Sequence, residues 1–312
     1  MIGVRDIARG VTALSVAVPT RELGKTGERV SCIGMGGFHL GVPEDPQETT
    51  RLVREALERG INFFDNSWDY LEGESERRLG HALQGGYREH AFVMTKVDGR
   101  TRHSAKRQLE ESLRRLKTDY IDLLQLHEVI REDDPERFFA PGGGIEAFLE
   151  ARDAGKIRYI GFTGHKNPDI HLKMLEEDFP WDTVQMPLNV LDAHYESFTR
   201  KVLPVLMERN IGILGMKPFA AGQLFEAGIV SAREALRYAL NLPASVIITG
   251  IQSQRDLDQA VETATSFRPL NRAEVGEILA KTAQVALDGK LEGYKTGNLY
   301  DSTALNPQWL VA

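Results

Sequence analysis

Residues 91–127 read AFVMTKV DGRTRHSAKRQLEESLRRLKTDY IDLLQLH, in which two apolar runs, 91–97 and 121–127, flank a helical candidate at 103–116. Each run is short and almost continuously apolar, which is typical of a strand buried on both faces of a sheet. The segment between the runs is long enough for the crossover helix that joins two parallel strands. This unit therefore predicts a parallel sheet whose outer face is covered by helices.

The same unit recurs along the chain, with strand starts about 30 residues apart. The strand candidates are 32–37, 61–65, 91–97, 121–127, 157–163, 183–188, 212–218 and 245–251. The helical candidates between them include 47–59, 74–84, 103–116, 144–154, 195–209 and 255–264. Eight such units close a barrel, whereas an open doubly wound sheet more usually carries a GxGxxG turn that residues 34–37 lack. The predicted fold is α/β, a (β/α)8 TIM barrel.

The chain has no Pro/Ser-rich linker, so we expect one barrel domain over residues 1–312. Residues 20–265 form the barrel, and the turn signals at 20–31 predict a small hairpin on its floor. Residues 266–312 contribute an extra helix at 271–287 and an irregular tail. Residues 1–19 are expected to be a plain N-terminal extension of a cytoplasmic protein. The alternative is the remnant of an export signal, because two arginines precede the apolar run 11–18.

Composition narrows the classes of partner. The 38 Lys and Arg residues against 45 Asp and Glu residues give a net charge of -7, which disfavours a nucleic-acid binder. Cys32 is the only cysteine, so an internal disulfide, an iron–sulfur cluster and a cysteine zinc site are excluded. No window approaches the roughly 18 apolar residues of a membrane helix. We expect a small-molecule partner, with no nucleic acid and no membrane.

Ionisable side chains stand at the carboxyl ends of three consecutive predicted strands. Asp65 closes the second strand, Lys96 lies near the end of the third, and His127 ends the fourth. Tyr70 follows Asp65 by five residues. Because the active site of an α/β barrel lies at the carboxyl ends of its strands, these four side chains are expected to meet at one mouth.

This set suits carbonyl reduction. An unperturbed phenol has a pKa of about 10, and a nearby ammonium would lower that pKa toward the range of a useful acid. A carboxylate beside the lysine would fix it, and the histidine would stabilise charge that develops on the substrate oxygen. The set is not a good metal site, and no GxSxG elbow occurs, so reduction would need a hydride-donating cofactor.

Four segments carry a resemblance to a known family. They are RELGKTG at 21–27, GINFFD at 60–65, GESERRLG at 73–80 and DLLQLH at 122–127. With Tyr70 and Thr95-Lys96 between them, the chain resembles the aldo-keto reductase family over roughly residues 20 to 265. The resemblance implies Tyr70 as general acid, Lys96 and Asp65 as its tuning pair, and His127 as the donor that orients the carbonyl. It also implies an extended NAD(P)H across the barrel mouth, NADPH by the family's habit, with NADH an alternative.

The resemblance assigns the remaining site residues as follows. The expected cofactor contacts are Gly36, Gly37, Phe38, Asp65, Thr163, Gln185, Met216, Lys217, Pro218, Phe219, Gly250, Gln252, Ser253, Arg255 and Asp256. The expected substrate pocket is walled by Phe38, His39 and Trp68. The segment 128–143, which carries three consecutive acidic residues at 132–134, is expected to be a solvated face.

The chain departs from the family pattern at the cofactor positions. Thr163-Gly164-His165 stands where Ser-Asn is usual, and Leu188 stands where an aromatic residue commonly stacks on the nicotinamide. Gln252 replaces a cation that often holds the 2′-phosphate, and Ala260 replaces an asparagine that contacts adenine. Arg255 or Lys217 is the candidate to compensate. Two other functions stay open, a cofactor-binding regulatory protein with slow turnover and an unrelated barrel hydrolase or lyase.

Overall fold

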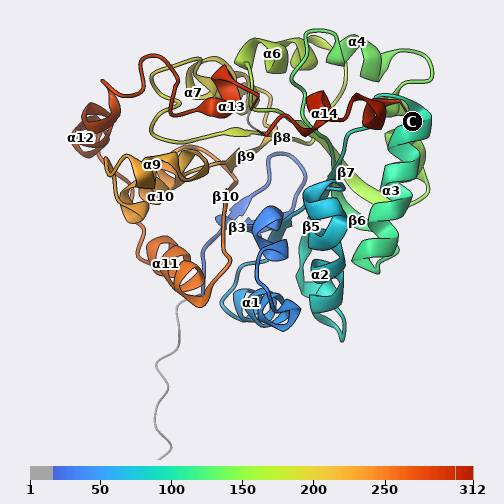
Figure 1. Cartoon of the computed structure of the whole chain (residues 1–312), viewed down its shortest axis with the longest axis horizontal. Helices are drawn as coiled ribbons and strands as arrows, with labels where there is room; N and C mark the ends of the chain where they lie inside the picture. The colour runs from blue at the N-terminus through green and yellow to red at the C-terminus, as the bar shows by residue number, and fades with distance from the viewer. Residues whose placement is uncertain (1–16, 299, 312) are drawn as a thin grey trace, which may run out of the picture.

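The computed structural model describes residues 17–298 and 300–311, and within them eight parallel strands close a barrel in the order β10-β3-β4-β5-β6-β7-β8-β9 (Figure 1). The predicted (β/α)8 fold is confirmed, and the predicted strands match the observed ones to within a few residues. The bounds are β3 Ile33–Gly36, β4 Phe63–Asp65, β5 Phe92–Val97, β6 Ile121–Leu126, β7 Ile157–Thr163, β8 Thr183–Pro187, β9 Gly212–Met216 and β10 Val246–Thr249.

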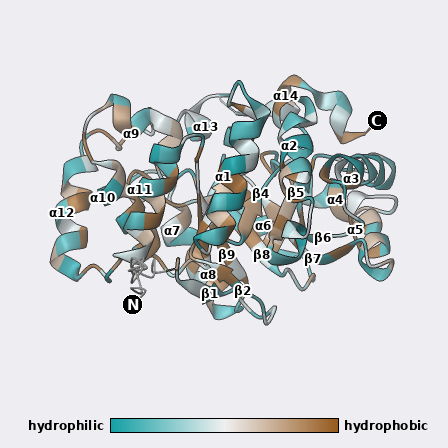
Figure 2. Cartoon of the chain, turned by 90° about the horizontal axis from the view of Figure 1, so that it is seen from below, coloured by the Kyte–Doolittle hydropathy of each residue, from teal (hydrophilic) through white to brown (hydrophobic). Residues whose placement is uncertain are grey.

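Helices surround the barrel and turn their polar faces outward (Figure 2). They are α1 Pro46–Glu58, α2 Glu74–Ala82, α3 Arg102–Leu116, α4 Asp134–Phe139, α5 Gly144–Asp153, α6 Pro168–Glu176, α7 Phe198–Lys201, α8 Leu203–Glu208, α9 Gln223–Glu226, α10 Ala232–Asn241, α11 Gln254–Thr265 and α12 Arg272–Thr282. The single helix predicted over 195–209 is wrong, because α7 and α8 are separate. Pro204 has no N–H to continue a helix from α7 and stands instead in the first turn of α8.

The predicted floor hairpin is present. Strands β1 (Thr20–Glu22) and β2 (Arg29–Ser31) pair antiparallel at the end of the barrel opposite α13 (Gly293–Thr296) and α14 (Ser302–Leu305) (Figure 2). Leu23 and Val30 of this hairpin are fully buried and belong to the cluster of side chains that fills the barrel interior. The hairpin therefore seals the floor and leaves the other end of the barrel for the site.

The C-terminal segment runs from α12 back across the barrel mouth to α3 (Figure 1). Its end is anchored by main-chain oxygens: Leu310 O accepts from Arg100 N at 2.8 Å, and Trp309 O accepts from Gln108 Nε2 at 2.8 Å. The extra helix predicted at 271–287 is the shorter α12. We call residues 300–311 the tail.

The solvated face expected over 128–143 is present at Glu132 and Asp133, which are exposed, but not at Asp134. Asp134 is fully buried at the start of α4, where its carboxylate accepts from Arg100 Nε at 2.8 Å and from two main-chain N–H groups. A buried carboxylate needs such compensation, and a cationic partner 34 residues away in sequence supplies it.

In the part of the chain that the structure describes, no helix is both long enough and apolar enough to cross a bilayer. The expected extension over residues 1–19 falls almost wholly outside the described residues, so the plain extension and the export-signal remnant both stay predictions.

Candidate active site

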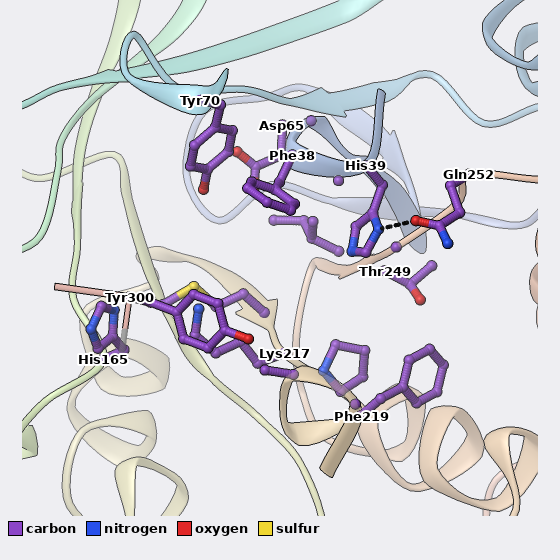
Figure 3. Close-up of a pocket in the computed structure, with 18 of the residues that line it drawn as sticks. Phe38, His39, Asp65, Tyr70, His165, Lys217, Phe219, Thr249, Gln252 and Tyr300 are labelled. Atoms are coloured by element: carbon purple, nitrogen blue, oxygen red, sulfur yellow. Dashed lines mark hydrogen bonds between the residues drawn. The ribbon is translucent and has the colours of Figure 1, made fainter. Parts of the chain in front are cut away.

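A cavity of about 1010 Å³ opens at the carboxyl ends of the barrel strands. It is large enough for a dinucleotide or a small substrate to be enclosed by protein. Most of the residues predicted for the site line it: Gly36, Gly37, Phe38, His39, Asp65, Tyr70, Lys96, His127, Thr163, Met216, Lys217, Pro218, Phe219, Gly250, Gln252, Ser253, Arg255 and Asp256. Figure 3 shows this cavity with the side chains that surround it.

Three of the predicted catalytic side chains are in direct contact. Lys96, buried on β5, donates to the carboxylate of Asp65 on β4, to Asn66 O at 2.6 Å and to the Tyr70 hydroxyl at 3.2 Å. These side chains come together because β4 and β5 pair in parallel and end at the same edge of the barrel. The lysine thus holds the phenol and the carboxylate at fixed positions.

Tyr70 is presented by a strained turn. The two residues after it, Leu71 and Glu72, have φ of 51° and 56°, and Gly73 has φ of 80°. Such left-handed conformations cost free energy in residues other than glycine and persist only where the surroundings enforce them. A Cβ on Gly73 would lie 2.4 Å from the guanidinium carbon of Arg115, which donates to Trp68 O at 2.7 Å. The turn that aims Tyr70 is therefore held by α3.

The expectation that Lys96 lowers the pKa of Tyr70 is wrong in this structure. Burial, followed by the negative charge of Asp65 and then that of Asp69, raises the pKa of Tyr70 well above its usual value near 10. The lysine charge is already shared with Asp65, so little of it remains to stabilise a phenolate. Tyr70 is consequently held as the protonated phenol, which is the form that can donate.

His127 follows β6, the strand beside β5, and its ring lies edge-on to that of Tyr70, 5.9 Å between centroids. It is held by a second acidic pair. Its Nδ1 lies 3.0 Å from Asp98 Oδ1 and 3.6 Å from Asp69 Oδ1. Burial alone would lower the pKa of His127, but these carboxylates outweigh it and raise that pKa. Burial also raises the pKa of Asp98 to about 6. His127, Asp98 and Asp69 each offer an atom that could bind a metal, and these atoms lie within 4.8 Å of one another. His127 and Asp98 are joined by a hydrogen bond and form an acid–base pair.

Of the predicted cofactor residues, Gln185 alone does not line the cavity, because its side chain is fully buried. Together with Thr163, which does line the cavity, it forms a corner of the site that has unpaired polar atoms. Thr163 at the end of β7 and Gln185 on β8 are register partners, and both are buried. Gln185 Nε2 donates to Asp65 Oδ2 at 2.8 Å, while Gln185 Oε1 and Thr163 Oγ1 have no hydrogen-bond partner among the described residues. Because buried polar atoms are costly when left unpaired, this corner fits a ligand with an amide group.

The opposite end of the cavity is formed by the start of α11. His39 Nδ1 and Gln252 Oε1 lie 3.1 Å apart and bridge the loops after β3 and β10 (Figure 3). His39 was expected in the substrate wall, but its ring packs against Gly250, where a Cβ would lie 2.4 Å from His39 Nε2. It thus belongs to the predicted cofactor end.

At this end of the cavity, Ser253 and Asp256 already form a hydrogen bond with each other, whereas Arg255 is free. Ser253 is the N-cap of α11, and its hydroxyl donates to the Asp256 carboxylate at 2.8 Å. Arg255 is exposed and has no hydrogen-bond or ion-pair partner among the described residues. At this end of the cavity Arg255 therefore has a free charge with which to meet a phosphate.

The substrate wall differs from the predicted one. Phe38 does line the cavity, with its ring edge-on to Tyr70 at 5.9 Å between centroids. Trp68 does not line it: its indole donates to Glu111 at 2.7 Å and packs edge-on against Trp309, which lines the cavity in its place. Leu188 is fully buried and likewise does not line the cavity.

The tail supplies a wall that the sequence did not indicate. Tyr300, Ser302, Leu305, Asn306 and Trp309 all line the cavity. The buried Glu128, which follows His127, accepts from Ser302 N at 2.9 Å and from Thr303 N at 2.8 Å. An acidic residue directly after the strand-end histidine was a local signal of function, but its partners lie 174 residues away.

Comparisons with known proteins agree with this geometry. The model of the Aldo/keto reductase family matches residues 32–234. L-galactose dehydrogenase of Arabidopsis thaliana is 34% identical over 295 residues, covering 81% of this chain and 90% of the relative. The uncharacterized oxidoreductase YqkF of Bacillus subtilis is 30% identical over 230 residues, 70% of each chain. The solved structure of aldo-keto reductase AKR11C1 from Bacillus halodurans, in its holo form, aligns with a TM-score of 0.72 at 26% identity, covering 85% of this chain and 96% of that one.

Proposed function

The chain belongs to the aldo/keto reductase family and is an oxidoreductase, and from this premise we propose that it reduces an aldehyde or ketone to an alcohol with NAD(P)H. The observation that carries the proposal is the contact of Lys96 with both Asp65 and Tyr70 in a cavity that His127 also lines. Tyr70 and His127 would offer a phenol and an imidazole to the substrate side by side, with their ring centroids 5.9 Å apart. Both are suited to a carbonyl oxygen that gains negative charge.

Each side chain has a distinct part in this proposal. The Tyr70 hydroxyl donates its proton to the substrate oxygen, and Lys96 fixes the phenol at 3.2 Å. Asp65 balances the lysine charge. His127, whose pKa is raised by Asp69 and Asp98, donates a hydrogen bond that orients the carbonyl. Because the pKa of Tyr70 is raised, the phenol enters the step with its proton in place.

The cofactor, when bound, supplies the hydride. Thr163 Oγ1 and Gln185 Oε1, both buried and unpaired, are the atoms that would hold the nicotinamide amide. At the far end, Arg255 is the free cation that would meet a 2′-phosphate, because Ser253 and Asp256 already cap α11. We therefore propose NADPH as the preferred cofactor, with weaker discrimination against NADH than a buried arginine would give.

Consumption of NADPH by the full chain under multiple turnover tests the function. The panel consists of aldehydes, ketones, quinones and aldoses, with oxidation of L-galactose by NAD(P)⁺ as the reverse arm because one relative bears that name. We expect repeated turnover with at least one class of carbonyl. Cofactor binding without turnover on the whole panel would instead support a regulatory protein that binds the cofactor.

A further inference from the structure

Buried lysines in this fold are paired with carboxylates. Lys96 has Asp65, and Lys295 donates to Asp192 at 2.8 Å and lies 3.1 Å from Glu292. This is the expected pattern, because an ammonium taken out of water needs an anion close by. The pairs neutralise the charge inside the molecule.

Lys217 is half-buried and differs from these two lysines. It lies in the loop after β9 and lines the cavity, yet its ammonium makes no hydrogen bond or ion pair to any described residue. The ammonium lies instead over the ring of Tyr300, 4.9 Å from the centroid (Figure 3), and over that of Tyr294, at 5.5 Å. Aromatic faces attract a cation but carry no net charge, so they hold the ammonium without neutralising it.

The carboxylates nearest to this ammonium are already used by other groups. Glu128 accepts two main-chain N–H groups of the tail. Asp301 accepts from His165 at 2.9 Å and from Lys166. Burial lowers the pKa of Lys217 to about 8, although Glu128 and Asp301 act in the other direction. Among the described residues, therefore, no carboxylate forms an ion pair with the Lys217 ammonium, although Glu128, Asp65 and Asp301 act on it from a distance.

The main chain holds Lys217 in place. Its φ is 53°, a conformation in which glycine is favoured over every larger residue. Its carbonyl oxygen accepts from Asn189 Nδ2 at 3.1 Å and from Ala220 N at 2.9 Å, which locks the turn. A long cationic side chain thus stands at a position whose backbone would suit glycine, and it points toward the tyrosines of the C-terminal segment.

We propose, resting on the proposed carbonyl reduction, that the Lys217 ammonium binds an anionic group of the substrate, so that the enzyme acts on carbonyl compounds bearing a carboxylate or phosphate. The diphosphate of the cofactor is the other anionic group that Lys217 could bind. The substrate is favoured because the ammonium lies against Tyr294 and Tyr300, on the tail side, whereas Arg255 and the His39–Gln252 bridge form the other end (Figure 3). Lys217 and Tyr70 line the same cavity.

A matched pair of substrates tests this inference on the full chain with saturating NADPH. The probes are 4-carboxybenzaldehyde and its neutral methyl ester, methyl 4-formylbenzoate, compared as the ratio of their kcat/KM values. We expect the unaltered chain to favour the carboxylate. Lys217→Met should lower the ratio about ten- to a hundredfold, the worth of a charge-assisted hydrogen bond. Lys217→Arg should retain most of the preference because it keeps the cation. Lys201→Met, at an exposed lysine paired with Asp169, should leave the ratio unchanged.

The outcomes separate the alternatives. An unchanged ratio in Lys217→Met, with the fold verified by circular dichroism, would overturn the inference. Equal losses for both aldehydes, together with weaker NADPH binding by fluorescence quenching, would assign Lys217 to the cofactor diphosphate and overturn it as well. Reduction of neither aldehyde by the unaltered chain would overturn the proposed function, which is distinguishable because the ester is still reduced when only the Lys217 role fails.

Discussion

The two sides of the barrel mouth are built differently. On the side of β4 to β6, the ionisable groups are buried and bonded to one another, as in the contacts of Lys96 with Asp65 and Tyr70. On the side of β9 and β10, Lys217 and Arg255 carry charges that no described residue neutralises. One side is thus complete before a ligand arrives, and the other is completed by a ligand.

This difference separates chemistry from recognition. Preorganised groups avoid reorganisation during the reaction, so the first side suits the proton transfer that any carbonyl requires. Unpaired positive charges instead select ligands, because only a ligand with an anionic group in the right position can neutralise them. Substitutions on the first side should change kcat, and those on the second should change affinity and preference.

The largest effect is expected for Tyr70→Phe. Loss of the proposed proton donor should lower kcat about 10²- to 10⁴-fold, because that is the usual contribution of general acid catalysis. Cofactor affinity, measured by fluorescence quenching, should remain close to that of the unaltered chain. A variant that keeps most of its kcat on the best carbonyl would remove Tyr70 from the chemical step.

Arg255→Ala should act on the other side of the mouth. We expect NADPH to bind about tenfold more weakly and NADH to be nearly unaffected, because the exposed guanidinium is screened by water and meets only the extra phosphate. Parallel titrations of the two cofactors measure this. Equal weakening of both would show that Arg255 does not recognise the 2′-phosphate.

Thr163→Val should have a smaller effect that is the same for both cofactors. The loss of one hydrogen bond should weaken NADPH and NADH binding alike, by about fivefold, since both contain the nicotinamide amide. The same titrations provide the contrast with Arg255→Ala. If binding is unchanged, the unpaired Thr163 Oγ1 has another role.

Asp98→Asn should give the smallest change in maximal rate and a shift in pH dependence. Above pH 6 the Asp98 carboxylate is ionised and stabilises protonated His127. Without that charge the pKa of His127 falls, so the loss of kcat/KM at alkaline pH should begin at a lower pH. A profile that does not move would show that Asp98 does not set the protonation of His127.

Much of the fold was predictable because strand and helix periods are local properties. The strand at 157–163 was predicted with its exact observed bounds, and the positions of Asp65, Lys96 and His127 followed from their strands. The ends of parallel strands meet at one edge, so their clustering needed no knowledge of packing. The roles of these residues stay proposals.

Long-range pairing was not predictable. Asp134 looked solvated among its acidic neighbours until Arg100 was placed beside it. Trp68 looked like a pocket wall because nothing local placed Trp309 in front of it. The direction of the Tyr70 pKa shift depended on counting several carboxylates that come from separate loops. Each of these features is decided by residues distant in sequence.

The tail has a consequence for how the molecule is made. Barrel closure ends with Thr249, but the wall that begins at Tyr300 comes about fifty residues later in the chain. At a synthesis rate of roughly 5–20 residues per second, that distance takes roughly 3–10 seconds. Until residues 294–303 have been made, the chain has neither the tyrosine rings that contact Lys217 nor the main-chain partners of Glu128. The selective pocket is therefore the last part of the site to be assembled.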